Sequence, residues 1–551
     1  LISVWRTASG LTPIIVRMIK RINIKSSTLI CLVALYFATV LNLSFWRYIT
    51  HNIQIDNPMM LMFAFSLGIF IFVPLYALFN LLICPYVGKF ITTILLLGSA
   101  AANYYMFVDG IYIDSDMVRN VMETNPRETM EHMSYSFWLY VLFSGVFPAL
   151  FLQMCSVRYQ PAAAEAKQRL KYVACSLLAT LLIGGICYKE YAIVGRNHNK
   201  VTKLVNTINY TYSFVRYCKK KAETNREFTV LDANPKIKNS NRNKLLVLFI
   251  GETARAQNFS LNGYVKETNP LLKKQDIVYF PNVVSCGTMT AVSLPCMFSA
   301  YNRKGFDTDD AAYTQNLLDI MQTAGYNVEW IDNDNGCKGV CNRVPTENVF
   351  YKCEGGICYD DILLKKLAQK IRHIKQNTVL VLHMIGSHGP AYYERYPEKF
   401  SHFKPDCRTS DIQSCSKEEI VNTYNNTIVY SDYILSSAID ILKKNANKYR
   451  NDSLIYISDH GESLGENNTY LHGLPYAFAP KTQTQVPMLF WLSKNMKKEI
   501  NSLCLQKKAS VQHSQDNFFH TVLGMADVQS SLYQKDMDIT ADCRQNDIAA
   551  K

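Results

Sequence analysis

Apolar stretches long enough to cross a membrane occupy the first part of the chain. Five of them fall within the first 200 residues, and each approaches the ~20 residues that a spanning helix requires. They cover residues 28–48, 59–83, 90–110, 137–156 and 172–194. No run of comparable length follows, so helices buried in a soluble core explain the set poorly. The pattern predicts an α-helical membrane domain with five spans.

The hydrophobic pattern changes to an α/β type in the second part of the chain. From residue 244, short apolar runs alternate with amphipathic segments, as in proteins whose strands and helices alternate. The predicted strands are 245–250, 326–331, 378–385, 453–457 and 486–492, and the predicted helices include 313–324, 359–373 and 417–444. We therefore expect a membrane domain at 1–195, a connecting helix and linker at 196–240 and a second domain at 241–551.

Basic residues predict the side of the membrane that each part faces, because Lys and Arg collect in short cytoplasmic loops. They cluster before the first span and between the fourth and fifth, whereas residues 51–57 contain none. The clusters are Arg17, Lys20, Arg21 and Lys25, and Arg158, Lys167, Arg169 and Lys171 of the 157–171 loop. The N-terminus is thus expected in the cytoplasm. An odd number of spans then places the chain after about residue 195, and the 111–136 loop, outside.

The composition agrees with a membrane protein. A hydrophobic content of 48%, with 34 Tyr and 27 Phe, excludes a disordered chain. The formal charge of +13 is compatible with nucleic acid, an anionic membrane surface or acidic lipid head groups. The sequence has no Lys/Arg-rich array with interleaved aromatic residues, so we expect membrane lipids rather than nucleic acid as partners.

Cysteines support an extracytoplasmic location for the second part. Ten of the 16 cysteines lie after residue 220, and eight of these form pairs that are ten, four, five and eight residues apart. Such local pairs are typical of disulfides in an oxidising compartment. A zinc ribbon is the alternative, but CKGVC and CEGGIC lack its two-residue spacing. The predicted pairs are Cys286–Cys296, Cys337–Cys341, Cys353–Cys358 and Cys407–Cys415, and the sequence does not decide whether Cys504 and Cys543 pair.

Four predicted strands end in polar residues. Their ends are Gly251-Glu252-Thr253, Asp332-Asn333-Asp334, His383 with Ser387-His388-Gly389, and Ser458-Asp459-His460. One such end is an ordinary turn. Because sites in doubly wound sheets form outside the carboxyl ends of parallel strands, we expect these four ends to converge.

Three of these side chains suit a metal. Glu252, Asp459 and His460 offer mixed oxygen and nitrogen ligands, which fit Zn²⁺ with an open fourth position. A buried ion pair or hydrogen-bonded cluster is the alternative. His388 and His472 are candidates for a second metal or for holding a phosphate.

The segment 285–299, SCGTMTAVSLPCMFS, offers a nucleophile that a metal would activate. Thr288, Thr290 and Ser293 lie between two cysteines that can clamp the segment, near the start of a predicted helix. Threonine at a helix start is usually a cap, and the spacing alone does not choose among the three hydroxyls.

Together these stretches resemble the lipid A phosphoethanolamine transferases, the EptA and mobile colistin-resistance family. The matching motifs are GETARAQNFSLNGY, SCGTMTAVSLPCMFS, LHMIGSHGPAYYERYPEKF and SDHGESLGENNTYLHGLPYAFAP, and the five spans also fit. The resemblance implies an extracytoplasmic catalytic domain with an alkaline phosphatase and sulfatase fold, built on a mostly parallel sheet. It also implies a multi-pass protein of the bacterial inner membrane whose catalytic domain lies in the periplasm.

The resemblance implies a role for each matching residue. Thr290 takes the position of the nucleophile, and Glu252, Asp459 and His460 take the zinc-ligand positions with Thr290 as fourth ligand. One zinc ion is expected, with a second as an option. The additional metal or phosphate positions are His383, His388 and His472, and the substrate-binding positions are Asn333, Lys338, Asn120, Thr124 and Glu128. The spacing of four in the last three predicts one helical face.

The implied reaction is ping-pong. The Thr290 alkoxide attacks phosphatidylethanolamine, releases diacylglycerol and passes phosphoethanolamine to a phosphate of lipid A. The modification reduces surface negative charge and thereby the binding of cationic peptides such as polymyxin. The enzyme is expected to be a monomer. The alternatives are transfer to core sugars of lipopolysaccharide, a membrane-anchored sulfatase or phosphatase, and a non-enzymatic lipid-binding protein. VSLPCMFS lacks the Arg that a sulfatase has after its Pro.

Overall fold

The computed structural model describes residues 22–52, 58–124, 126–188, 191, 201–222, 227–238, 243–334, 336–350, 353, 358–447 and 450–544. Within these residues the chain forms two compact units, one from 22–115 with 135–215, the other from 116–134 with 216–544. Residues 116–134, which are most of the segment between the third and fourth spans, therefore belong to the second unit. The domain boundaries expected from the sequence stay a prediction.

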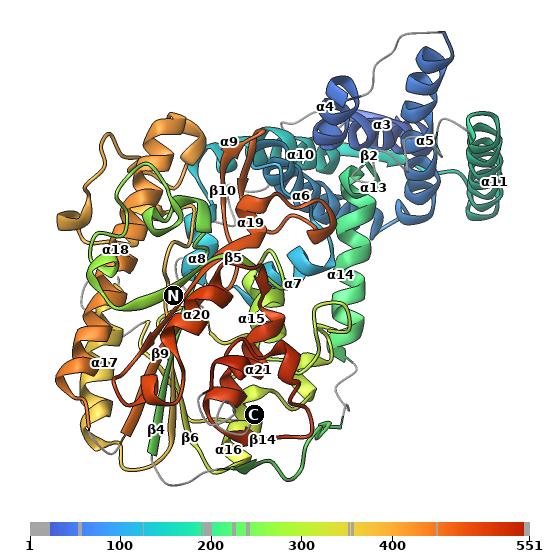
Figure 1. Cartoon of the computed structure of the whole chain (residues 1–551). Coiled ribbons are helices and arrows are strands. Elements are labelled where there is room, and N and C mark those ends of the chain that lie inside the picture. The colour runs from blue at the N-terminus through green and yellow to red at the C-terminus, as the bar shows by residue number, and fades with distance from the viewer. Residues whose placement is uncertain are drawn as a thin grey trace, which may run out of the picture. The chain divides into compact units, whose positions relative to one another are not determined.

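Five helices of the first unit are long and apolar enough to span a membrane, which confirms the expected number (Figure 1). They cover Ser26–His51, Met62–Leu82, Gly88–Val108, Tyr135–Met154 and Ala162–Ile186. Two of these spans are composite. The first joins α3 (Ser26–Thr39), η1 (Val40–Asn42) and α4 (Leu43–Asn52), and the fourth joins α9 (Tyr135–Val141), a π-helical turn η2 (Leu142–Val146) and α10 (Phe147–Met154). The second, third and fifth are α5 (Pro58–Leu82), α6 (Gly88–Val108) and α11 (Ala162–Ile186).

The fifth span differs from its prediction. Helix α11 begins at Ala162, about ten residues before the apolar stretch, so most of the expected 157–171 loop is helical. Its first turns are rich in Ala, Glu, Lys and Arg, which are strong helix formers, and Arg169 pairs with Glu165 one turn away at 2.9 Å. A hydropathy pattern detects the apolar part of a helix but not its polar end.

The second unit contains an eight-stranded sheet in the order β13-β5-β12-β9-β4-β8-β6-β7. Strands β9, β4, β8, β6 and β7 run parallel, and β12 is antiparallel to both of its neighbours. The bounds are β4 (Asn243–Gly251), β5 (Ile277–Val284), β6 (Asn327–Asp332), β7 (Thr346–Asn348), β8 (Thr378–His383), β9 (Arg450–Ser458), β12 (Gln485–Leu492) and β13 (His513–Ser514). All five predicted strands are present, and the mostly parallel α/β fold is confirmed.

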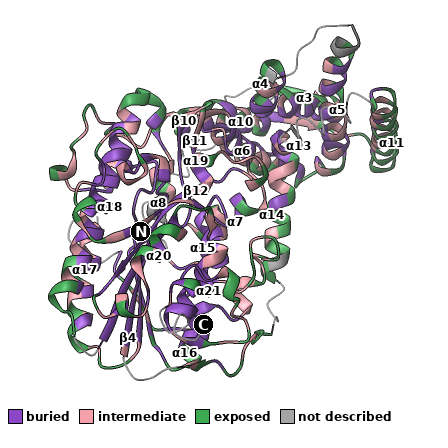
Figure 2. Ribbon diagram, in the orientation of Figure 1, coloured by how far each residue is buried: buried purple, intermediate pink, exposed green. Residues whose placement is uncertain are grey.

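Helices cover both faces of this sheet, because successive side chains of a strand point to opposite faces. Leu246, Leu248 and Ile250 of β4 pack into one core with α16 (Leu317–Thr323), α20 (Ser502–Ala509) and α21 (Asp516–Met525). The alternate positions of β4 pack into a second core with α17 (Asp361–Lys370) and α18 (Lys417–Lys444). Figure 2 shows the central strands buried between these layers.

The predicted cysteine pairs are all present. The disulfides are Cys286–Cys296, Cys337–Cys341, Cys353–Cys358, Cys407–Cys415 and also Cys504–Cys543. In the described part of the chain the free cysteines all precede residue 220. The division between paired and free cysteines agrees with a second unit in an oxidising compartment.

Candidate active site

The four polar strand ends meet at one edge of the sheet, as the sequence predicted. In the order β9, β4, β8 and β6 the strands are neighbours and parallel, so their carboxyl ends lie side by side. Asp459 and His460 follow β9, Glu252 follows β4, and His383 ends β8. All four side chains are fully buried. A turn between buried strands does not require four ionisable groups in contact with each other.

Thr290 is the hydroxyl that reaches this cluster. It is the first residue of α15 (Thr290–Met297), and its Oγ1 lies 3.1 and 3.2 Å from the two carboxylate oxygens of Glu252. It also lies 3.4 Å from Nε2 of His460. The other candidates point elsewhere, since Thr288 donates to the Leu474 carbonyl and Ser293 to the Asp459 carbonyl. The structure thus separates three hydroxyls that the spacing could not.

The donor atoms of Glu252, Asp459 and His460 fit a metal ion. Nδ1 of His460 donates to the Gly461 carbonyl at 2.9 Å, so the neutral ring presents an unprotonated Nε2. That Nε2 lies 3.3 Å from Glu252 Oε1 and 3.3 Å from Asp459 Oδ2. Asp459 Oδ2 is buried and has no hydrogen-bond partner. Three acceptors facing one another in a dry site repel, and a cation between them relieves the repulsion.

The electrostatics of Glu252 point the same way. Burial raises its pKa well above the usual range, and the carboxylates of Asp459 and Asp334 raise that pKa further. A bound divalent cation offsets both effects and favours the ionised carboxylate. The fit of the residues to a metal therefore rests on charge as well as on geometry.

Gly461 shows why a glycine follows Asp459 and His460. A Cβ atom at this position would collide with the carbonyl oxygen of Thr482. The backbone N–H groups of Gly461 and Glu462 donate to the carbonyls of Gln483 and Thr482. Close approach of two backbone segments therefore sets the path of the chain directly after the ligands.

His388 and His472 lie beside the cluster. Their ring centroids are 5.6 Å apart, and the ring centroid of His472 is 4.5 Å from that of His460. His472 Nδ1 lies 3.2 Å from Glu462 Oε2, while burial lowers the pKa of His472. Among the described residues, none of the groups of close ligand atoms includes either histidine. Whether this pair binds a metal or a phosphate stays a prediction.

Asn333 and Lys338 occupy the turn after β6. The Asn333 amide donates to the Cys358 carbonyl at 3.2 Å and to Asp360 at 2.9 Å, and its side chain is fully buried. Lys338 Nζ donates to the backbone carbonyl of Glu123 at 3.3 Å. Asn333 thus holds the turn, and Lys338 contacts the segment 116–134.

The expectation that Asn120, Thr124 and Glu128 share one helical face is wrong. Helix α7 (Ser115–Glu123) ends before Thr124, and a second helix, α8, spans Pro126–His132. Proline disfavours a helical conformation at the preceding residue, so the two helices are separate. Thr124 Oγ1 donates to the Asn120 carbonyl at the end of α7, and the side chain of Glu128 lies outside the described residues.

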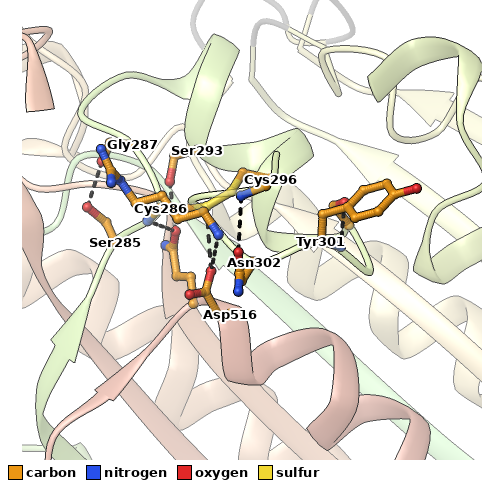
Figure 3. Close-up of a disulfide and its surroundings, with 12 residues drawn as sticks. Ser285, Cys286, Gly287, Ser293, Cys296, Tyr301, Asn302 and Asp516 are labelled. Atoms are coloured by element: carbon orange, nitrogen blue, oxygen red, sulfur yellow. Dashed lines mark hydrogen bonds between the residues drawn. A yellow bond between two sulfur atoms is a disulfide. The ribbon is translucent and has the colours of Figure 1, made fainter. Parts of the chain in front are cut away.

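The Cys286–Cys296 disulfide (Figure 3) closes the segment 286–296, called the nucleophile segment below for its candidate hydroxyl, Thr290. It joins the turn after β5 to the last part of α15, with Thr290 between its two cysteines. Asp516 lies next to this disulfide and accepts a hydrogen bond from the backbone N–H of Arg303 at 2.8 Å. The disulfide therefore ties the turn before α15 to the end of that helix.

Sequence reasoning missed Gln515. Its side chain is fully buried, its Oε1 accepts from the Cys286 N–H at 2.6 Å, and the Ser293 hydroxyl lies 2.8 Å from the same oxygen. Its amide also donates to the carbonyls of Ser458 and Asp459, both at 2.7 Å. Gln515 thereby links the nucleophile segment to the strand end that carries Asp459. Nothing in its local sequence marks it, because its partners are more than 50 residues away.

Known families match both parts of the chain. Residues 244–528 match the Sulfatase family, and residues 71–222 match the family described as Phosphoethanolamine transferase EptA/EptB. Phosphoethanolamine transferase EptA of Escherichia coli (strain K12) is 41% identical over 543 residues, which cover 96% of this chain and 99% of that protein. Phosphatidylethanolamine transferase Mcr-1 of Escherichia coli is 34% identical over 495 residues, which cover 86% of this chain and 91% of that protein.

A solved structure agrees over nearly the whole chain. The integral membrane protein lipooligosaccharide phosphoethanolamine transferase A of Neisseria meningitidis superimposes with a TM-score of 0.90 at 38% identity. The match covers 95% of this chain and 99% of that one. Fold and site define a multi-pass membrane enzyme whose catalytic part has the alkaline phosphatase and sulfatase fold. The chain belongs to the EptA family of phosphoethanolamine transferases.

Proposed function

We propose that the enzyme transfers phosphoethanolamine from phosphatidylethanolamine to a phosphate of lipid A, with Thr290 as the covalent carrier. The observation that carries the proposal is the position of Thr290 Oγ1, within 3.4 Å of both Glu252 and His460 in a buried site. Family membership supports phosphoethanolamine as the transferred group. The donor and the acceptor are both phosphate-bearing membrane lipids, which an active site anchored to the membrane can reach.

Zn²⁺ is the proposed metal, and Glu252, Asp459 and His460 would hold it with Thr290 at the fourth position. Three ligands of mixed oxygen and nitrogen with one open position are typical of catalytic zinc. When bound, the ion supplies positive charge that lowers the pKa of the Thr290 hydroxyl and offsets charge on the reacting phosphoryl group.

The protein residues then have distinct tasks. Glu252 accepts a hydrogen bond from the Thr290 hydroxyl and so orients its oxygen. The hydroxyl first loses its proton to solvent; the resulting alkoxide oxygen then forms a bond to phosphorus, and the bond from phosphorus to the diacylglycerol oxygen breaks. His388 and His472 hold the phosphoryl oxygens, and one of them gives a proton to the departing diacylglycerol. In the second half, a lipid A phosphate oxygen attacks phosphorus and Thr290 leaves.

The remaining assignments follow from the orientation of the spans. We place the protein in the bacterial inner membrane as a monomer, with the catalytic unit in the periplasm, where the disulfides persist. Asn120, Thr124, Glu128, Asn333 and Lys338 are proposed to contact the substrates. Alkaline phosphatase fused after residue 230 is expected to be active, and a cytoplasmic reporter active at that point would overturn the orientation.

Mass spectrometry of lipid A tests the function. Cells that express the wild type are expected to carry lipid A with one added phosphoethanolamine group, and cells that express Thr290→Ala are not. Peptide mapping of the purified wild type after exposure to phosphatidylethanolamine should find phosphoethanolamine on Thr290. Modification of core sugars alone would instead support the alternative acceptor, with the same chemistry at Thr290.

A further inference from the structure

We propose that a second divalent cation binds between Glu252, Asp334 and His383, so that Glu252 bridges two ions. One ligand atom from each of these residues lies within 4.8 Å of the others, and all three side chains are buried. Glu252 is the residue that this cluster shares with Asp459 and His460. Of the three histidines that the resemblance assigns to an additional metal or phosphate, this ligand set uses His383 and neither His388 nor His472.

His383 is prepared as a ligand. Its Nδ1 donates to Asp332 Oδ2 at 3.1 Å, so the neutral ring presents Nε2 as an acceptor. That Nε2 is buried, has no hydrogen-bond partner and lies 3.9 Å from Asp334 Oδ2. Metal-binding histidines commonly donate their other ring N–H to a carboxylate, which sets the ring orientation and raises ligand basicity. His383 has this arrangement.

Asp332, which accepts the hydrogen bond from His383, has hydrogen-bond partners at both of its carboxylate oxygens. Asp332 Oδ2 also accepts from the Trp330 indole N–H at 2.7 Å. Its Oδ1 accepts from the backbone N–H groups of Asp334 and Gly336, at 3.0 and 3.2 Å. Asp332 is thus fully occupied in holding His383, which leaves Asp334 and Glu252 as the carboxylates that face Nε2.

The negative charges of the buried carboxylates also favour a cation at this position. Glu252, Asp332, Asp334 and Asp459 are four carboxylates at most 5% exposed, at the carboxyl ends of β4, β6 and β9. One divalent cation at the first cluster balances Glu252 and Asp459. A second divalent cation between Glu252, Asp334 and His383 lowers the repulsion among these buried carboxylates. The competing occupant is a proton on His383, because burial lowers the pKa of His383 but the carboxylates of Asp332, Asp334 and Glu252 together raise it to about 9.

The ligand chemistry indicates the class of ion. Two carboxylates and one imidazole suit Zn²⁺ or Mn²⁺ better than Mg²⁺, which prefers oxygen ligands alone. Bonds of roughly 2.1 Å to zinc place tetrahedral ligand atoms about 3.4 Å apart. Closing from 4.8 Å or less to that separation requires only small side-chain movements.

Metal analysis of the detergent-purified full chain tests the proposal. After dialysis against Zn²⁺, Mn²⁺ or Mg²⁺ in separate samples, mass spectrometry is expected to count two ions per wild-type chain with Zn²⁺ or Mn²⁺. Asp334→Asn and His383→Gln are expected to hold one ion, and the matched surface change Asp276→Asn two. Asp332→Asn should weaken the second ion by roughly 10–100-fold, as loss of a hydrogen-bond partner of a metal-binding histidine does.

Two results would overturn the proposal. One is a single ion per wild-type chain at saturation, which assigns the site to a proton on His383. The other is an Asp334→Asn chain that still holds two ions. Intact disulfides and an unchanged circular dichroism spectrum verify that each variant is folded. The proposal goes beyond the transfer reaction and does not depend on the lipid acceptor. A wild type with two ions and no lipid A modification would therefore contradict the proposed function and leave this site standing.

Discussion

Two clusters, each made of two carboxylates and one imidazole, share Glu252. They differ in the group that accepts a hydrogen bond from Nδ1 of the histidine. In the cluster with Asp459, the ring of His460 is held by a backbone carbonyl, that of Gly461. In the cluster with Asp334, the ring of His383 is held by the Asp332 carboxylate. Thr290 contacts the first cluster, through Glu252 and His460. The ligand types of the two clusters are alike, so the position of one hydroxyl is the reason that we expect the chemistry at the first cluster.

Removal of a ligand that belongs to the first cluster alone should have the largest effect. Asp459→Asn and His460→Gln are expected to lose both the tightly bound ion and transfer, because only two of the three carboxylate and imidazole ligands then remain, too few to retain zinc. Metal analysis of the purified chain and mass spectrometry of lipid A measure the two losses. A variant that keeps full transfer would show that the first cluster is not the reaction centre.

Removal of the hydroxyl should separate metal binding from turnover. Thr290→Ala is expected to lower transfer below detection and to retain most of the metal, since Glu252, Asp459 and His460 remain. Thr290→Ser is expected to keep part of the activity, because the chemistry requires only a hydroxyl. If Thr290→Ala still modifies lipid A, the carrier is not Thr290, and Thr288 or a water molecule must replace it.

The histidine pair should affect rate more than metal content. His388→Ala and His472→Ala are each expected to lower transfer by roughly 10²–10⁴-fold, the range for loss of a positioned proton donor. Metal content of the first cluster should be unchanged, since neither histidine belongs to it. Loss of zinc in either variant would show instead that the pair binds metal.

Gln515 should have the smallest effect on chemistry and a clear effect on stability. Gln515→Ala removes partners from Cys286, Ser293, Ser458 and Asp459, and each buried group left unpaired costs about 1–3 kcal/mol. The melting temperature should fall, whereas exposed Gln529→Ala should leave it unchanged. Gln515→Glu keeps the acceptors but loses both donors, so a drop in transfer rate at unchanged KM would identify a positioning role. Equal melting temperatures for all three variants and the wild type would contradict this role.

Much of the fold followed from local pattern. Helix α18 has the predicted bounds, 417–444, because Ser416 and Glu419 form a capping box at its start. Strands β5, β7 and β13 were missed for local reasons as well. Strand β5 contains Pro281, and β7 and β13 are three and two residues long, so none shows the usual strand pattern. These three strands are stabilised by backbone hydrogen bonds to their neighbours in the sheet, which a local sequence pattern does not reveal.

The metal-binding candidates could be predicted because the sheet topology fixes where the strands end. Parallel neighbouring strands bring their carboxyl ends together for any conformation of the connecting loops. Glu252, Asp459 and His460 were therefore expected in one place. The same reasoning pointed to His383. It did not find Asp334 as a partner of Glu252, since a residue two positions past a strand end can turn in several directions.

The sequence by itself determined the five spans, the alternation of strands and helices, the local disulfides and the convergence of four strand ends. Each of these depends on periodicity, spacing or strand direction, which are local properties of a chain. Only the tertiary structure decided that Thr290, rather than Thr288 or Ser293, faces Glu252, and that Gln515 joins its segment to Asp459. Those choices depend on hydrogen bonds between residues far apart in sequence, whose directions are set when the sheet and its covering helices pack.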